Sequence, residues 1–163
     1  MAYIFSVIKS LLPRSLLDLI RPPYHFALAY AASLRYQHPS RELIVIGVTG
    51  TKGKSSTTEI MARILEAQGY KTASLSTIHF KIAGEAKRNL FKMTMPGRFF
   101  VQKFLRDAVA AGCTHVVLEI TSEGARQYRH RFLELDGLIF TNLTPEHIES
   151  HGSFEKYKQA KLS

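Results

Sequence analysis

Residues 43–58 read Leu-Ile-Val-Ile-Gly-Val-Thr-Gly-Thr-Lys-Gly-Lys-Ser-Ser-Thr-Thr, and this stretch decides the fold. Its first four residues are apolar and mostly β-branched, which is typical of a buried strand. Residues 54–68 then have the spacing of a helix that closes at Gly69. The glycines between the two lie where the chain needs a tight loop. The stretch therefore predicts a strand, a glycine-rich loop and a helix in succession.

The glycine-rich loop predicts phosphate binding. Backbone N–H groups in such a loop, together with the positive end of the helix behind it, hold phosphate oxygens. In this position Lys54 would reach the β- and γ-phosphates of a nucleotide, and Ser55 would bind Mg²⁺. The spacing misses the common G-x-x-x-x-G-K-[ST] pattern by one residue, because the first glycine of that pattern falls on Val48. The alternative is a glycine-rich turn in which Gly-Lys-Ser occurs by chance.

Strand and helix patterns alternate along the rest of the chain. Apolar runs predict further strands, a mixed stretch predicts a hairpin that turns near Gly84-Glu85, and amphipathic stretches predict helices. The strands are expected at 71–76, 115–120 and 137–141, the hairpin at 79–93, and the helices at 97–111, 123–132 and 154–163. Continuous apolar strands separated by helices are typical of a mostly parallel α/β sheet that is covered on both faces. Ligands of such sheets bind at the carboxyl ends of the strands.

The first residues predict neither a membrane span nor a cleaved leader. Charged residues interrupt the apolar stretch at 3–20, so no apolar run approaches the ~18 residues that a span needs. Five Lys and Arg against one Asp make residues 1–41 a basic lead. This lead either packs on the domain behind it or makes a weak contact with a membrane surface through residues 1–21.

Helical spacing within this lead predicts three helices and a linker. The first would break at Pro13, and the second would be stopped by Pro22-Pro23, since proline lacks an N–H group and clashes with the preceding turn. The third spans residues 24–36, and a linker follows from His38 to residue 41.

Composition limits the classes of function. Of the 163 residues, 45% are hydrophobic and 21% are charged, as in ordinary soluble domains. The net charge of +9 favours anionic partners. The basic residues are spread along the chain without an aromatic-interleaved element, so we expect no nucleic-acid binding. The single cysteine, Cys113, cannot form an internal disulfide and favours a reducing compartment, the cytoplasm. We interpret it as a buried small side chain rather than a nucleophile.

Other candidate residues follow a strand or form a cluster. Glu119 ends an apolar strand, where a carboxylate more often faces a cleft than a core. Arg126, Arg129 and Arg131 form the densest basic cluster. This cluster either binds an oxyanion of a substrate or lies on a solvated helix face, because arginine suits both roles.

Four segments, in order along the chain, resemble the Mur ligase family, whose members add amino acids to the precursor of peptidoglycan. The first is the glycine loop with its shifted glycines. The second, Leu118-Glu-Ile-Thr-Ser-Glu123, is similar to the Glu-x-Ser-Ser segment of the family. The third, Phe140-Thr-Asn-Leu-Thr-Pro-Glu-His-Ile-Glu-Ser-His-Gly152, is similar to its Thr-Asn-Leu-x-x-Asp-His-Leu-Asp-x-His-Gly segment. The fourth, Tyr157-Lys-Gln-Ala-Lys161, matches the lysine-bearing helix of the family.

Two further segments point to one branch of the family. Leu75-Ser-Thr-Ile78 and Lys92-Met-Thr-Met-Pro-Gly97 are similar to the ligases that attach the third residue of the stem peptide. The chain also departs from the family. It has Thr94-Met95-Pro96 where Thr-Thr-Pro is usual, and Thr121-Ser122-Glu123 where Ser-Ser-His is usual.

The resemblance implies a function and a set of site residues. It implies an α/β fold with a P-loop-like ATP-binding central domain, and an ADP-forming amide ligase that activates a carboxylate as an acyl phosphate. The implied substrates are ATP and a UDP-N-acetylmuramoyl-peptide. The implied ligands of Mg²⁺ are Ser55 and Glu119, with His147 and a carbamylated Lys161 at a second ion. The residues implied to bind the nucleotide are Gly50, Thr51, Lys52, Gly53, Lys54, Ser55, Ser56 and Asn142. Those implied to bind the acceptor are Ser76, Thr77, Thr94, Ser122 and Arg129.

The resemblance also implies how the chain is divided. Residues 1–41 would be a helical lead and linker, and residues 42–163 a central ATP-binding domain that stops before its sheet is complete. We therefore expect no ligase turnover from the 163 residues alone. Two alternatives are a ligase like folylpolyglutamate synthetase, whose loop shares Thr-Lys-Gly-Lys, and a nucleotide-binding module without catalysis. The His-x-x-x-His-Gly segment and the Ser-Thr-Ile stretch favour the peptidoglycan ligases over the first alternative.

Overall fold

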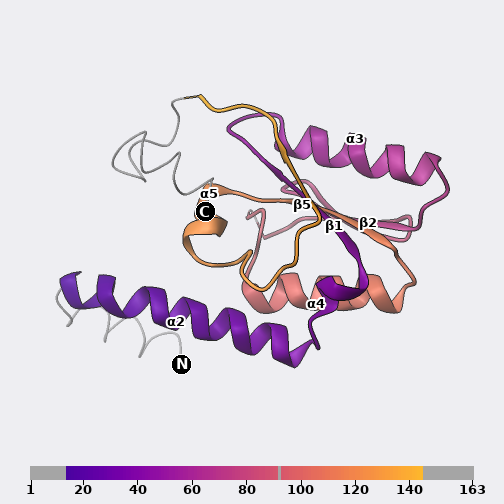
Figure 1. The fold of residues 1–163 in the computed structure, drawn as a ribbon. Helices are drawn as coiled ribbons and strands as arrows, with labels where there is room; N and C mark the ends of the chain where they lie inside the picture. Colours follow the sequence, from indigo (N-terminus) through magenta and orange to yellow (C-terminus); the bar gives the residue numbers. More distant parts are fainter. Residues whose placement is uncertain (1–13, 92, 145–163) are drawn as a thin grey trace.

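The computed structural model describes residues 14–91 and 93–144, which form a six-stranded sheet in the order β4-β3-β2-β5-β1-β6 (Figure 1). Four strands run parallel: β1 (Ile44–Thr49), β2 (Thr72–Leu75), β5 (His115–Glu119) and β6 (Gly137–Phe140). At one edge, β3 (His79–Ile82) and β4 (Glu85–Arg88) form an antiparallel hairpin. The predicted hairpin and the predicted, mostly parallel α/β sheet are both confirmed.

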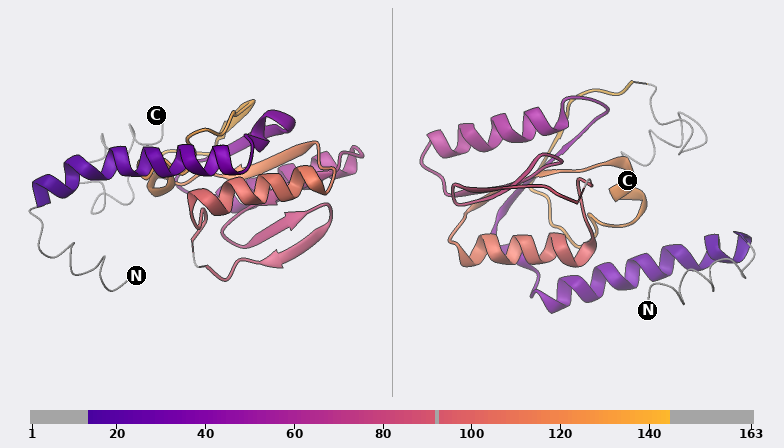
Figure 2. Two further views of the ribbon diagram at one scale, coloured as in Figure 1. Left: turned by 90° about the horizontal axis from the view of Figure 1, so that it is seen from below. Right: turned by 180° about the vertical axis from the view of Figure 1, so that it is seen from behind.

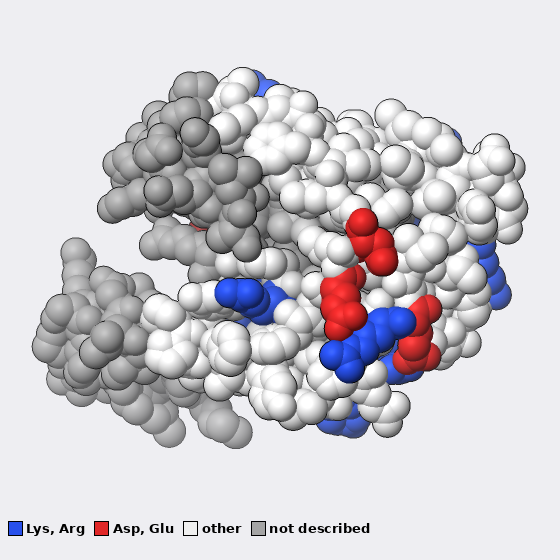
Figure 3. Space-filling model, viewed as in Figure 1, with Lys and Arg blue, Asp and Glu red and all other residues white. Residues whose placement is uncertain are grey.

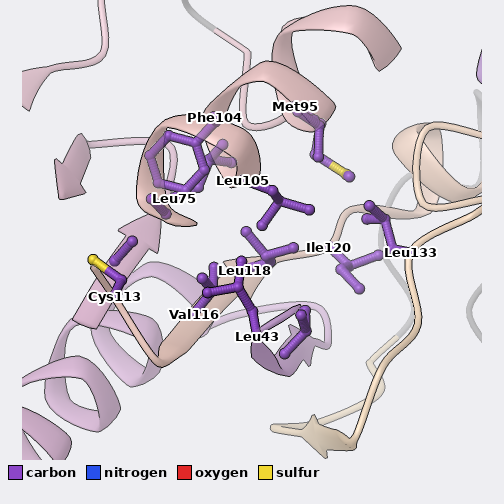
Figure 4. Close-up of a cluster of buried hydrophobic side chains, with 14 residues drawn as sticks. Leu43, Leu75, Met95, Phe104, Leu105, Cys113, Val116, Leu118, Ile120 and Leu133 are labelled. Carbon is purple, nitrogen blue, oxygen red and sulfur yellow. The ribbon is translucent and has the colours of Figure 1, made fainter. Parts of the chain in front are cut away.

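Helices cover both faces of this sheet (Figure 2). On one face, α3 (Lys54–Ala67) packs Ala62 against Val48 and Val117. On the other face lies α4 (Arg98–Ala110), above the larger of the two buried clusters (Figure 4). Both helices end within one residue of their predicted bounds. The larger cluster includes Leu43, Leu75, Met95, Phe104, Leu105, Cys113, Val116, Leu118, Ile120 and Leu133.

Cys113 lies inside this larger cluster. Its side chain is 5% exposed, and burial raises the pKa of its thiol. The thiolate form that a nucleophile needs is therefore disfavoured at neutral pH. The interpretation of Cys113 as a buried side chain is confirmed.

The helix α2 (Arg14–Arg35) runs without interruption through Pro22 and Pro23. The prediction of a helix that stops at these prolines, followed by a second helix from residue 24, is wrong. Each proline removes one backbone hydrogen bond, but its fixed φ is compatible with a helix. Both prolines are exposed, and the later part of α2 packs on α4, so tertiary packing stabilises the helix beyond its local preferences. The helix predicted to end at Pro13 lies outside the described residues.

The later part of α2 is fixed to the domain. Ala29 and Ala32 are buried, and their small side chains let α2 approach α4 closely. Where α2 ends, Arg106 of α4 donates from Nε to the Tyr36 carbonyl and from Nη2 to the Gln37 carbonyl, at 3.0 Å each. These hydrogen bonds satisfy carbonyl groups that the end of a helix leaves free.

The predicted linker is a short 3₁₀ helix, η1 (Pro39–Glu42), and it packs on the domain. Pro39 and Ser40 are buried, and the Ser40 hydroxyl accepts a hydrogen bond from the Glu134 backbone N–H. Glu42 pairs with Arg106 of α4 at 2.8 Å. Residues 39–42 are therefore part of the packed structure rather than a free connection.

The helix α5 (Ser122–Arg126) is shorter than the predicted helix at 123–132, so that prediction is wrong in its extent. The chain turns because Tyr128 takes a left-handed conformation with φ 55°. The Tyr128 N–H then bonds the Ala125 carbonyl, and the Arg129 N–H bonds the Gly124 carbonyl, both at 2.9 Å. This pair of hydrogen bonds defines a Schellman motif, which ends the helix and redirects the chain.

None of the helices within residues 14–91 and 93–144 is long and apolar enough to span a membrane. The contact of residues 1–21 with a membrane surface stays a prediction, and most of that segment lies outside the described residues. The helix predicted at 154–163 lies wholly outside them.

Candidate phosphate-binding site

The carboxyl ends of the four parallel strands meet at one edge of the sheet, as the register pairs Val48 with Glu119 and Thr49 with Phe140. The glycine loop follows β1, Ser76 and Thr77 follow β2, Glu119 ends β5, and Asn142 comes shortly after β6. This edge is where α/β sheets bind ligands. The glycine loop, Ser76, Thr77, Glu119 and Asn142 therefore lie at one edge of the sheet.

Asn142 holds the glycine loop in shape. Its Oδ1 accepts the Lys52 N–H at 2.9 Å, its carbonyl accepts the Thr51 N–H at 3.0 Å, and its Nδ2 donates to the Lys52 carbonyl at 3.1 Å. The neighbouring Thr141 hydroxyl also donates to the Lys52 carbonyl, at 2.7 Å. The structure thus gives Asn142 the role of shaping the loop that was predicted to bind phosphate.

Gly50 and Gly53 allow the loop its path, with φ of 143° and 80°. A Cβ atom at Gly50 would lie 2.0 Å from the Thr141 hydroxyl oxygen, whereas a Cβ at Gly53 would meet nothing within 4 Å. Gly50 is therefore required by both conformation and close approach. Gly53 is required by conformation alone.

Lys54 and the start of α3 form the cationic side of the site. The Lys54 ammonium group donates to the Thr51 carbonyl at 2.8 Å, so its charge lies within the loop. The first turn of α3 contains no acidic residue, which leaves its positive helix end available to an anion. Ser56 is exposed in this same turn.

Glu119 is the centre of a polar network, and its own side chain is buried, with 2% exposed. Its carboxylate accepts the Ser55 hydroxyl at 2.9 Å and the Thr77 N–H at 2.8 Å. The Thr77 hydroxyl lies 3.1 Å from each carboxylate oxygen and 2.6 Å from the Thr94 hydroxyl. The network connects Ser55 of the glycine loop with Thr94, at the far side of the site.

This network fits a bound Mg²⁺ ion. Within the described residues, no basic side chain pairs with the Glu119 carboxylate, and a buried charge without a counter-ion is costly. A carboxylate and a hydroxyl are the hard oxygen ligands that Mg²⁺ takes, with water and phosphate oxygens as the rest. In residues 14–91 and 93–144 no group of three or more His, Cys, Asp or Glu could hold a metal by itself. The predicted ligands His147 and Lys161 lie outside this range.

Another predicted residue, Ser76, has structural contacts. The Ser76 hydroxyl accepts the N–H groups of Ile78 and His79 and donates to the His79 carbonyl, so it shapes the turn into β3. Ser122 is 8% exposed at the start of α5.

Arg129 is turned inward, away from the solvated helix face that was one alternative for the basic cluster. Its Nη1 donates to the Met95 carbonyl, and its Nη2 donates to Gln127 Oε1 at 2.7 Å. Burial lowers the pKa of Arg129. Arg131 instead lies over the Tyr128 ring, 5.9 Å from its centroid. Arg129 and Arg131 therefore do not act as one surface.

Sequence reasoning missed Thr141, Met95 and Arg98 as parts of this region. Thr141 could have been found, because it is the last residue of a predicted strand and precedes Asn142 in the quoted motif. Nothing local marks Arg98, whose contact with the residues after α5 joins segments 29 residues apart. The buried position of Met95 likewise depends on its packing beside Gly124.

Charged side chains on the face shown in Figure 3 are interleaved, with acidic and basic groups side by side. This face carries no broad basic area. The predicted absence of nucleic-acid binding is a statement about partners and stays a prediction.

A parallel sheet with a glycine-rich loop between a strand and the helix after it defines the class of phosphate-loop α/β domains. Within this class the chain belongs to the Mur ligase family, because the profile of the Mur ligase middle domain matches residues 48–163. The resemblance of the four sequence segments is thereby confirmed.

The lengths of its relatives show what share of a complete ligase this chain spans. It is 39% identical over 142 residues to UDP-N-acetylmuramyl-tripeptide synthetase of Roseiflexus sp. (strain RS-1), covering 86% of this chain and 28% of the relative. It is 40% identical over 135 residues to UDP-N-acetylmuramoyl-L-alanyl-D-glutamate--2,6-diaminopimelate ligase of Cytophaga hutchinsonii, covering 83% and 27%. A solved structure of such a diaminopimelate ligase matches with a TM-score of 0.63 and 29% identity, over 73% of this chain and 23% of the other. The chain thus spans about a quarter of the length of these relatives.

Proposed function

We propose that this chain binds ATP with Mg²⁺ as the central domain of an ADP-forming amide ligase. The observation that carries the proposal is the 2.9 Å hydrogen bond between Ser55 of the glycine loop and the buried Glu119 carboxylate. A loop that cradles phosphates, beside a buried carboxylate with no basic partner in residues 14–91 and 93–144, would provide the two halves of a Mg²⁺–nucleotide site. Gly50, Gly53 and the loop held by Asn142 supply the phosphate cradle.

The reaction that we propose for the whole ligase has two steps. A carboxylate oxygen of the acceptor attacks the γ-phosphorus, the bond to the β-phosphate oxygen breaks, and ADP leaves. The amine of the added amino acid then attacks the acyl phosphate, and phosphate leaves through a tetrahedral intermediate while the amine loses a proton. Transfer of this kind depends mainly on positioning and charge neutralisation. Lys54 would neutralise the transferred phosphoryl group, with Ser55 and Glu119 holding Mg²⁺, which supplies further positive charge there.

The acceptor that we propose is a UDP-N-acetylmuramoyl-peptide. The relatives are named for ligation to such a substrate, and one name specifies L-alanyl-D-glutamate with 2,6-diaminopimelate. Thr77 and Thr94 place two hydroxyl groups 2.6 Å apart beside Glu119, and Arg129 lies beyond them. These residues would hold the acceptor in a position from which its carboxylate reaches the γ-phosphate. The roles of His147 and a carbamylated Lys161 at a second Mg²⁺, and a location in the cytoplasm, remain part of this proposal.

Calorimetric titration of the 163-residue protein with ATP, with and without Mg²⁺, tests the nucleotide site. We expect Mg²⁺-dependent binding that Lys54→Met weakens at least about tenfold, since a charge-assisted phosphate contact contributes on the order of 1.5–3 kcal/mol. Glu119→Gln keeps the shape of the network but removes its charge, so it should abolish most of the Mg²⁺ dependence. Lys87→Met, on the exposed strand β4, is the matched control. Wild-type protein that does not bind ATP, or Lys54→Met that binds as tightly as wild type, would contradict the proposal.

A further inference from the structure

The helix α2 presents an uncharged face to its surroundings. Residues 22–34 contain no Asp, Glu, Lys or Arg. Ala29 and Ala32 lie on the inner side of the helix and are buried against the domain. The residues on the opposite side have helical spacing and are all exposed; they are Pro23, Ala27, Tyr30, Ala31 and Leu34. We call these five residues the outer face of α2.

Aromatic contacts fix the direction of the outer face. Phe26 and Tyr30 both pack on Phe132, with ring centroids 5.1 and 5.4 Å apart. Tyr30 is nevertheless 48% exposed, and Leu34 is 49% exposed. Figures 1 and 2 show α2 along the outside of α4, with its first half extending beyond α4. The outer face is therefore held away from the domain and open to a partner.

The exposed faces of the other two long helices carry charges. On α3, exposed isoleucines alternate with the ion pair of Arg63 and Glu59. On α4, Lys103 pairs with Asp107 on the exposed side. Interleaved charges of this kind keep the outer side of a helix in water. The outer face of α2 lacks them, and an apolar patch with a polar rim marks an interaction surface.

Basic residues at both ends of the outer face indicate the kind of partner. Arg21 precedes the face in the chain, and Arg35 is the last residue of α2. The Arg35 guanidinium lies over the Tyr36 ring, 5.6 Å from its centroid, and it has no ion pair within residues 14–91 and 93–144. Residues 1–41 carry five Lys and Arg against one Asp. A second copy of the chain would bring two basic leads together, whereas an anionic lipid surface attracts them.

We infer that the outer face of α2 is a docking surface for an anionic lipid bilayer. The helix lies in the plane of the headgroup layer, with Ala27 and Leu34 toward the acyl chains and Arg35 at the lipid phosphates. Tyr30 suits this depth, because its ring is apolar and its hydroxyl is polar. The contact is peripheral, since no helix in the described part of the chain is long and apolar enough to span a membrane. This inference goes beyond the proposed function and does not depend on nucleotide binding.

Vesicle flotation of the 163-residue protein tests the docking surface. The vesicles contain phosphatidylcholine alone or a mixture of phosphatidylcholine and the anionic phosphatidylglycerol. We expect the protein to bind the mixed vesicles at least about tenfold more tightly, because the basic residues add attraction to the apolar contact. High salt should weaken this binding, since it screens that attraction.

Leu34→Glu and Ala27→Glu each place an acidic group on the outer face and should weaken binding to the mixed vesicles at least about tenfold. Arg35→Gln should weaken it about fivefold, through loss of one contact with the lipid phosphates. The matched control is Ile64→Glu on α3, which makes the same change of charge at a residue that is 53% exposed and should stay within about twofold of wild type. Thermal melting verifies that each variant is folded. If Leu34→Glu does not fold, Ala27→Glu, at an exposed alanine, gives the same comparison.

A tryptophan probe reports the depth of the helix directly. The chain has no tryptophan, so Tyr30→Trp provides a single fluorophore on the outer face. Its emission should shift to the blue with mixed vesicles, whereas the emission of Ile64→Trp should not change.

Three outcomes would overturn the inference. The first is wild-type protein that binds the mixed vesicles no better than pure phosphatidylcholine. The second is vesicle binding that Leu34→Glu and Ala27→Glu weaken no more than Ile64→Glu does, which would place the contact elsewhere in the chain. The third is a dimer in sedimentation velocity that Leu34→Glu dissociates, which would make the outer face an interface between copies.

Discussion

Gly50 and Gly53 of the glycine loop differ in how much space their surroundings leave for a side chain. Gly50 and Gly53 both have positive φ, but only Gly50 lies against neighbouring atoms, those of Thr141 and Asn142. Their substitutions therefore separate the conformational requirement of a glycine from the steric one.

We predict that Gly50→Ala destabilises the protein by about 3 kcal/mol or more, and Gly53→Ala by about 1–2 kcal/mol. The first adds a clash at 2.0 Å to the cost of the left-handed conformation, whereas the second has only that cost. Urea denaturation followed by circular dichroism measures both. Equal destabilisation by the two substitutions would show that Asn142 and Thr141 do not hold the loop as the structure has it.

At the scale of helices and strands, packing outweighs local preference. The helix α2 continues through Pro22 and Pro23, and α5 ends early at a tyrosine, against the pattern of the sequence in both cases. In α2 the stabilising contact is the close approach to α4 at Ala29 and Ala32.

We predict that Ala32→Leu destabilises the protein by about 1–3 kcal/mol, because Ala32 is fully buried and an added isobutyl group overpacks the α2–α4 contact. Ala31→Leu places the same side chain on the exposed side of the helix and should change stability by less than about 0.5 kcal/mol. Thermal melts of both variants make the comparison. A larger effect at residue 31 than at residue 32 would mean that α2 packs through a different face.

Glu66 connects α3 to two strands and makes stability depend on pH. Burial alone would raise the pKa of Glu66, but hydrogen bonds from Lys81 and Thr72, at 2.7 and 2.8 Å, outweigh it and lower the pKa overall. A carboxyl whose pKa is lower in the folded state stabilises the protein above its unfolded pKa. That stabilisation is lost as the pH falls through the folded value.

We therefore expect the free energy of unfolding to decrease as the pH is lowered below about 4.3, the ordinary glutamate pKa. In Glu66→Gln that decrease should be smaller, by about 1 kcal/mol or less, as for other partly exposed ion pairs. Urea titrations between pH 3 and 7 measure the difference, with Glu59→Gln, at the exposed pair with Arg63, as the control. A Glu66→Gln profile that parallels the wild-type profile would assign the acid sensitivity elsewhere.

At the scale of the whole molecule, the buried Cys113 reports on the opening of the core. It is the only cysteine of the chain and lies between α4 and the sheet, whereas the phosphate-binding site lies at the carboxyl edge of the strands. Because a thiol reagent reaches Cys113 only when the core opens, its labelling rate measures the stability of the domain.

We predict that Cys113 reacts with a disulfide reagent far more slowly in the folded protein than in urea. ATP with Mg²⁺ at 100 times its dissociation constant should slow labelling about 100-fold, since ligand binding then stabilises the folded state by about 2.7 kcal/mol. Absorbance of the released thiolate follows the reaction. Fast labelling in the folded state, unaffected by urea, would mean that Cys113 is open to solvent.

Much of the fold was predictable, because its signals are local. The strand, loop and helix of residues 43–68, the hairpin and α4 follow from periodicity and from glycine positions. The candidate site was predictable only residue by residue. Glu119, Ser55 and Asn142 were each identified from the sequence. Their contacts were not: the sequence did not predict that Ser55 and Thr77 donate to the same carboxylate. It also did not predict that Asn142 accepts hydrogen bonds from Thr51 and Lys52. The break predicted at Pro22-Pro23 and the predicted length of α5 were wrong, because α2 depends on contacts with α4 and α5 ends at the left-handed Tyr128.

The sequence by itself determined the phosphate loop, the order of strands and helices along the chain and the family, because these depend on residues close to one another in the chain. Only the tertiary structure decided which distant side chains meet. Thr77 and Glu119 are 42 residues apart, and Arg98 reaches Gln127 across 29 residues. Such contacts exist only once the parallel strands assemble and bring their carboxyl ends to one edge. The physical reason is that periodicity fixes the face on which a residue lies but not the partner opposite it.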